Sequence, residues 1–219
     1  MSKGSGSSRN PYRAANPQQV ITVAGNGKRM RTSSIISSEE SISTMNNRDM
    51  QKELQQAISR YEAVMGVRQR KVMLADLKGA YGATTMNGDG SLAVYVDRGF
   101  FDRPKDEVEK EYVNQNYRRR GGFKNTTRKP AQHTLTHELA HATWSSNYRN
   151  PKHQAAGKEI NEVYKTFMKD KSSSRKKNYG SYGTENADEF FAEVVTKAIH
   201  GDNDNYTRKI KAIVKKYNL

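Results

Sequence analysis

The sequence predicts an α+β fold in which one helix is followed by extended segments and then by a run of helices. A helical stripe of apolar residues begins near Asn47, strand-like segments lie between residues 71 and 97, and four helical patterns follow from Pro130 onward. A chain of 219 residues is long enough for one well-packed core. We therefore expect a single folded domain over residues 46–219, preceded by an arm.

Residues 1–45 are expected to form a flexible basic arm or an extended anchor. The segment is rich in Ser, Gly, Asn and Arg, and its only strand-like fragment covers residues 20–23. The whole chain has 38 Lys and Arg against 23 Asp and Glu, a net charge of +15. Such a charge favours polyanionic neighbours, so the arm could contact nucleic acid or a capsid, although solubility alone also explains it.

The absence of cysteine limits the chemistry available to the chain. With no cysteine, disulfides, thiolate zinc sites and a cysteine nucleophile are excluded, and any transition metal must be held by His and carboxylate. The first residues lack the apolar run of a signal peptide, and no stretch approaches the roughly 18 apolar residues of a membrane span. We expect a cytoplasmic or virion-associated protein without membrane contact.

The domain should open with a helix and continue with two strands. The apolar residues that recur at helical spacing are Met50, Leu54, Ala57, Ile58, Tyr61, Val64 and Met65. Extended segments follow at Lys71–Leu77 and at residues 91–97, with turn residues at 87–90. In the second segment, Leu92, Val94 and Val96 alternate with Ala93 and Tyr95. Residues 105–129 are highly charged, which indicates a short helix followed by a loop.

Four helices should complete the domain. The first runs from Pro130, a residue suited to a first helical turn, to about Ser145. The other three are predicted from apolar residues at helical spacing, which are Ile160, Val163, Tyr164 and Phe167, then Phe190, Phe191, Val194, Val195 and Ala198, and finally Ile210, Ile213, Val214 and Tyr217.

The first of these four helices contains the pattern HExxH, formed by His137, Glu138 and His141. Chance would produce this pattern only about 0.007 times in a chain of this composition. Residues four apart lie on one side of a helix, so both imidazoles can bind one zinc ion. Glu138 then lies beside the metal, where it can take a proton from water. An ordinary buried helix with two hydrogen-bonded histidines is the alternative.

A catalytic zinc site usually has three protein ligands, so a further ligand is required. Asn147 stands where a third histidine of a HExxHxxGxxH site would be. Glu189 and Glu193 are four apart on one helix face, so one could bind zinc while the other accepts a hydrogen bond from a ligating histidine. His153 is the alternative ligand, although a surface histidine is its simpler interpretation.

Two other histidines have simpler interpretations. His133 lies one helical turn before the HExxH pattern and suits a supporting or packing role better than that of a ligand. His200 precedes Gly201 and is typical of a helix C-terminus.

The segments HELAH at 137–141 and SYGTENADEFFAE at 181–193 resemble the catalytic domain of anthrax toxin lethal factor and its relatives. These are gluzincin-type zinc endopeptidases, some of them encoded by phages or prophages. The likeness covers residues 130–215, with weaker similarity over 71–101. It implies a zincin-like α+β fold with a small mixed sheet on the HExxH helix, and it implies that residues 91–97 form the edge strand that receives a peptide substrate.

The resemblance also implies a role for each site residue. The metal ligands would be His137, His141 and Glu189, the base would be Glu138, and Glu193 would match the family's second acidic position. Tyr182 would stabilise the oxyanion or protonate the leaving amine, with Tyr179 as a nearby competitor. The basic insertion at 118–129 has no counterpart in the family, and the substrate is not indicated.

Two other functions fit parts of the sequence. One is a non-catalytic protein of zincin-like fold that holds metal or packs into a phage particle or another assembly. The other is a SprT-like metalloprotease that acts near DNA and uses a third histidine, here His153. The net charge of the chain suits that class. However, Gln154 and Ala155 stand where a Gly and an aromatic residue would be expected after the histidine.

Overall fold

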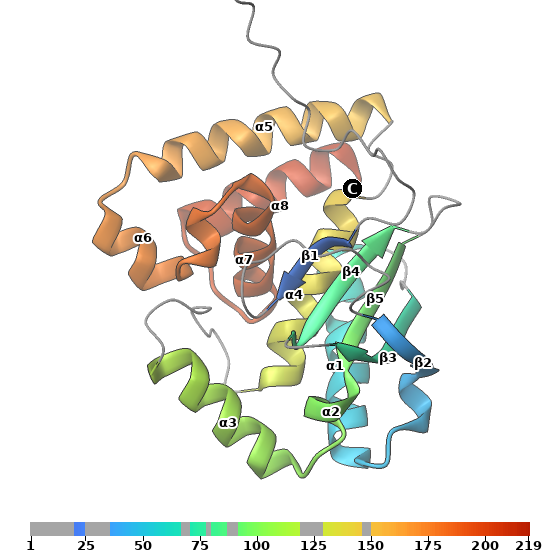
Figure 1. Ribbon diagram of the computed structural model, residues 1–219. Coiled ribbons are helices and arrows are strands. Elements are labelled where there is room, and N and C mark those ends of the chain that lie inside the picture. The colour runs from blue at the N-terminus through green and yellow to red at the C-terminus, as the bar shows by residue number, and fades with distance from the viewer. Residues whose placement is uncertain are drawn as a thin grey trace, which may run out of the picture.

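Five strands form one mixed sheet in the computed structural model of the protein, and helices pack against it (Figure 1). The structure describes residues 20–24, 36–66, 71–77, 80–86, 92–118, 129–145 and 150–219. The strands are β1 (Val20–Ala24), β2 (Ile36–Ser41), β3 (Lys71–Leu77), β4 (Gly82–Met86) and β5 (Leu92–Asp97). The helices are α1 (Arg48–Met65), α2 (Arg98–Phe101), α3 (Lys105–Arg118), α4 (Pro130–Ser145), α5 (Pro151–Met168), α6 (Ser172–Tyr179), α7 (Ala187–Ile199) and α8 (Asn205–Tyr217), with short 3-10 turns at Ile42–Thr44 and Tyr182–Thr184. The predicted α+β class is confirmed.

The order of strands in the sheet is β1-β4-β5-β3-β2. β3 and β5 run parallel, and the other neighbouring pairs are antiparallel. The expectation that residues 91–97 form an edge strand is wrong, because β5 pairs with β3 on one side and with β4 on the other. The two edges are instead formed by β1 and β2, which both come from the segment whose composition predicted an arm.

The alternation predicted for β5 is confirmed, although both of its faces are buried. Val94 and Val96 join the main core, whereas Ala93 and Tyr95 belong to a smaller apolar cluster that also contains Ala83. Side chains that alternate along a strand point to opposite faces of the sheet. The sheet therefore has one face against the helical core and a second face with its own small cluster.

Helix α1 forms where its apolar stripe predicts, with caps at both ends. Asn47 accepts hydrogen bonds from two backbone N–H groups of the first turn, and Gly66 ends the helix in the left-handed conformation at φ 67°. The stripe is buried except for Val64, which is 43% exposed. The Tyr61 hydroxyl lies 2.7 Å from Thr143 Oγ1, so a buried polar contact joins α1 to α4.

Helix α4 is the central element of the domain. It contacts α1, α7, β4 and β5, and its residues 131–143 are all buried. The HExxH helix is thus an internal element of the domain. Polar side chains on such a helix lose contact with water, so each needs a partner within the protein or a bound ligand.

The predicted C-terminal helices α5, α7 and α8 are present, and α6 is an additional helix that its polar sequence did not reveal. Phe167, Tyr179, Phe190 and Tyr206 pack ring against ring between these helices. Within the described segments, no helix combines the length and the apolar character needed to cross a membrane. The turn expected at 87–90 and the basic loop after Arg118 lie outside the described residues.

Candidate metal centre

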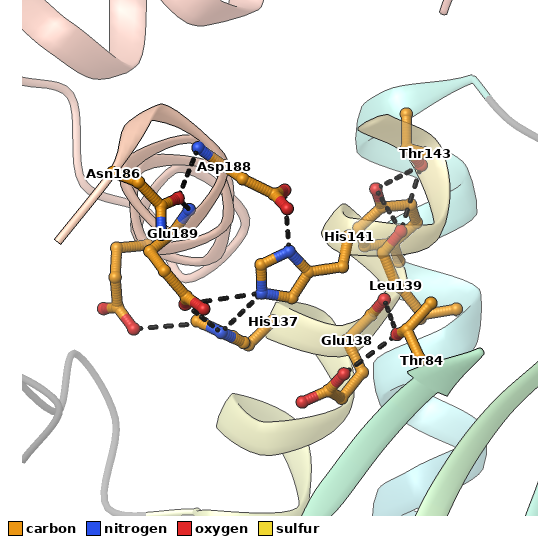
Figure 2. A network of polar contacts seen from close by, with 11 residues as sticks. Thr84, His137, Glu138, Leu139, His141, Thr143, Asn186, Asp188 and Glu189 are labelled. Carbon is orange, nitrogen blue, oxygen red and sulfur yellow. Dashed lines mark hydrogen bonds and ion pairs between the residues drawn. The ribbon is translucent and has the colours of Figure 1, made fainter. Parts of the chain in front are cut away.

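The candidate site lies where α4 packs against α7. His137 and His141 are one turn apart on α4, and Glu189 lies in the first turn of α7 (Figure 2). Asn186 caps α7 by accepting hydrogen bonds from the N–H groups of Asp188 and Glu189, which fixes the direction of this turn. The packing of α4 against α7 therefore brings the three side chains together.

The three potential ligand atoms form a nearly equilateral triangle. The Nε2 atoms of His137 and His141 are 3.0 Å apart, and Glu189 Oε2 lies 3.3 Å from the first and 3.4 Å from the second. A tetrahedral zinc ion with bonds of about 2.0–2.2 Å separates its ligands by about 3.3 Å. Within the described part of the chain, this is the one group of His and carboxylate side chains close enough to hold a metal ion.

The other ring nitrogen of each histidine faces a carboxylate. His141 Nδ1 lies 2.9 Å from Asp188 Oδ1, and His137 Nδ1 lies 3.0 Å from Glu193 Oε1, the latter poorly aligned for a hydrogen bond. An imidazole that carries its proton on Nδ1 presents a lone pair at Nε2. Two such lone pairs and a carboxylate oxygen then face one another, an arrangement that needs a cation between them.

Because this group is buried, the negative charge of its carboxylate needs a positive charge close by. Glu189 is 5% exposed and both histidines are fully buried, and Glu189 Oε2 accepts no hydrogen bond of good geometry. A buried carboxylate without a donor is unfavourable unless a cation compensates it. The donor set of two imidazoles and one carboxylate is also one that binds zinc. The residues therefore fit a divalent metal ion.

The shifted pKa values of the same residues indicate a negative electrostatic potential at the site. Burial lowers the pKa of His137, but Glu189 and Glu193 outweigh this effect and raise it to about 9. Burial likewise opposes a charged His141, yet Asp188 and Glu189 hold its pKa well above the ordinary value. For Glu189, burial is outweighed by the two histidines, and its pKa falls to about 2. A bound metal ion would supply the positive charge that protons otherwise provide.

Glu138 lies beside the triangle and is not part of it. Its side chain points from α4 toward β4, where Thr84 Oγ1 donates to Glu138 Oε2 at 2.8 Å (Figure 2). The other oxygen, Oε1, is buried and has no hydrogen-bond partner. Burial raises the pKa of Glu138, although the nearby histidines partly oppose this. The carboxylate is therefore held at one oxygen, and its basicity is higher than that of an exposed glutamate.

Tyr182 is close to the candidate metal ligands, whereas Tyr179 makes its contacts elsewhere. The ring of Tyr182 lies edge-on to the His137 ring at a centroid distance of 6.2 Å, and the residue is buried. Tyr179 donates its hydroxyl proton to Asp204 and packs on Phe167. Of the two tyrosines proposed from the sequence, Tyr182 is thus the one that the fold places beside the site.

The remaining histidines lie outside the triangle. His133 stacks on His137 at 6.5 Å, and its Nε2 is 3.9 Å from Glu193 Oε1, which agrees with a supporting position. His200 caps the C-terminus of α7, as predicted. His153 lies in the first turn of α5 and does not join the group that could hold a metal ion.

Two residues at the site were missed in the sequence. Asp188 contacts His141, but an aspartate in a first helical turn is already explained by the helix dipole. Thr84 contacts Glu138 from β4, a strand that its sequence GATTM did not reveal. No local signal in the sequence identified either residue as part of the site.

Comparisons of the chain with models of protein families, with curated proteins and with solved structures found no match. What the site can do must therefore be inferred from its own residues. Two histidines and a carboxylate can hold a divalent ion, and a separate buried carboxylate beside them can accept a proton. These are the groups needed for metal-assisted hydrolysis.

Proposed function

We propose that the protein is a zinc-dependent endopeptidase of zincin-like fold, similar to the lethal factor family. The observation that carries the proposal is the triangle of His137, His141 and Glu189 with Glu138 beside it. A bound zinc ion would supply Lewis-acid activation of a water molecule and of the substrate carbonyl. His137, His141 and Glu189 would hold it.

The chain's own residues would handle the proton and the developing charge. Glu138 takes one proton from the attacking water as the new C–O bond forms, and this proton passes to the amide nitrogen as the C–N bond breaks. Its raised pKa suits both halves of this transfer. Tyr182 would donate a hydrogen bond to the oxyanion or help to protonate the leaving amine. Asp188 and Glu193 would keep both imidazoles oriented with Nε2 toward the metal.

A structural role is the second candidate, and the burial of the site favours it. His137, Glu138 and His141 are fully buried, and closed metal sites are typical of structural zinc. In that case the domain would hold metal within a phage particle or another assembly. The SprT-like alternative is less favoured, because a carboxylate takes the third position and His153 lies elsewhere.

Digestion of a peptide library separates these functions. The full chain is incubated with the library, with and without 1,10-phenanthroline, and beside it the Glu138→Gln variant. The proposal predicts cleavage that the chelator stops and added zinc restores, and a variant that retains zinc but has lost activity by at least about 100-fold. Zinc-loaded protein with no cleavage at all supports the structural role instead.

A further inference from the structure

The outer edge of β4 is occupied by a strand from the chain's own N-terminal region. β1 pairs antiparallel with β4, with Ala24 opposite Gly82 and Thr22 opposite Thr84. β1 also contacts α4, the HExxH helix. In Figure 1, β1 lies alongside β4 and in front of α4, whereas β2 forms the opposite edge of the sheet.

β4 is the strand that touches the candidate base. Thr84 Oγ1 donates to Glu138 Oε2, and a Cβ atom added to Gly82 would lie 2.8 Å from Glu138 Cγ. Glycine at position 82 thus permits the close approach of β4 to α4. A chain paired with the outer edge of β4 therefore runs directly beside the proposed catalytic group.

A peptide substrate would need this same edge. Extended peptides bind sheets by adding a strand to an open edge, where unpaired N–H and C=O groups await partners. β5 is paired on both sides, and β2 lies at the edge remote from β4. The outer edge of β4 is the position that would bring a bound peptide to Glu138, and β1 already fills it.

We propose that Val20–Ala24 is an intramolecular occupant of the peptide-binding edge, so that the full chain is held in an inhibited state. This inference rests on the proposed peptidase function. The burial of His137, Glu138 and His141 agrees with it, since a substrate can reach them only after a covering segment has moved. The substrate class implied is an extended peptide that pairs antiparallel with β4 through its backbone.

The pairing of β1 with β4 is irregular, and this irregularity would keep β1 from being cleaved efficiently while it occupies the edge. Val20 pairs with Thr85 and Thr22 with Thr84, so the ladder carries one extra residue at Ile21. A bulge of this kind bends the strand and redirects the backbone. The irregularity stands next to the residue that contacts Glu138, where a substrate would need regular pairing to present its scissile bond.

The connection between the two edge strands is long enough for this arrangement. From Ala24 to Ile36 the chain can span at most about 43 Å, whereas four strand spacings amount to about 19 Å. A tether of this length keeps the arm at an effective concentration in the millimolar range beside the edge. A free peptide must compete against that concentration.

The test breaks the pairing in the full chain. Successive N–H groups of a strand point to opposite sides, so the double variant Thr22→Pro/Val23→Pro removes one N–H that faces β4 in either orientation. The matched control Thr22→Val/Val23→Ile keeps both donors and favours a strand. We expect kcat/KM for a cleaved library peptide to rise at least about fivefold in the proline variant and to stay unchanged in the control. Amide exchange in β4 should accelerate in the proline variant alone.

Two results distinguish a failure of this inference from a failure of the proposed function. Chelator-sensitive cleavage at equal rates in both variants, with equal amide exchange in β4, overturns the role of β1 and leaves the peptidase standing. If amide exchange in β4 is faster in the proline variant but no variant cleaves any peptide, the pairing of β1 with β4 is supported. The proposed peptidase function is then refuted.

Discussion

Asp188 offers a quantitative test of how the metal site is supported. Its Oδ1 lies 2.9 Å from His141 Nδ1, and its side chain is 8% exposed. Asp188→Asn keeps the shape but turns a charge-assisted hydrogen bond into a neutral one, a loss of about 1–1.5 kcal/mol. Asp188→Ala leaves a buried N–H without an acceptor, which costs about 1–3 kcal/mol. Zinc affinity should therefore fall about tenfold in the first variant and up to about 100-fold in the second.

The assay is competition for zinc between the protein and a chromophoric chelator at fixed pH. Asp49→Asn serves as control, because Asp49 is exposed at the start of α1 and does not belong to the metal-binding group. Thermal unfolding of each metal-free variant checks that the fold is intact. If both Asp188 variants bind zinc within twofold of the parent chain, the supporting role assigned to this residue is refuted.

Four further predictions concern the site and its surroundings. Glu189→Ala should lower zinc affinity by at least about 100-fold, measured as metal retained after dialysis, and full retention would exclude it as a ligand. Gly82→Ala should lower the free energy of unfolding in urea by about 1–3 kcal/mol, because the new Cβ meets Glu138 at 2.8 Å. Gly157→Ala, in open space on helix α5, should raise it by about 0.5–1 kcal/mol. The pKa of His137 is raised to about 9 in the folded protein. The charged imidazole therefore stabilises the metal-free fold below about pH 6.5, and this stabilisation is lost as the pH rises through about 9. A melting temperature of the metal-free protein that does not change over this pH range would contradict the prediction.

The chemistry of the site could be predicted from the sequence because it depends on helical spacing. His137 and His141 are four apart, and so are Glu189 and Glu193, and a helix alone places each pair on one face. That Glu189 lies opposite both imidazoles required the packing of α7 on α4 as well. The residue pattern left open whether Glu189 or Glu193 would bind the metal, and only the resemblance to the lethal factor family indicated Glu189.

The residues that the sequence did not reveal depend on tertiary packing. Asp188 precedes Glu189, yet it reaches a different histidine, because the cap at Asn186 and the crossing of the two helices decide where each side chain points. β4 consists of small residues and a glycine, which do not indicate a strand, and the glycine at position 82 leaves room for α4 to lie against it. Strand order also depends on long-range pairing, which explains why β5 was wrongly expected at an edge.

The proposed function requires that two imidazoles and one carboxylate hold a single zinc ion. X-ray absorption at the zinc edge, recorded on the purified full chain at one equivalent of zinc, tests this directly. The predicted spectrum has two imidazole nitrogens and at least one carboxylate oxygen at about 2.0–2.2 Å, and the oxygen contribution changes in Glu189→Ala. A six-oxygen shell without imidazole scattering, or a spectrum unaltered by that substitution, would contradict the account.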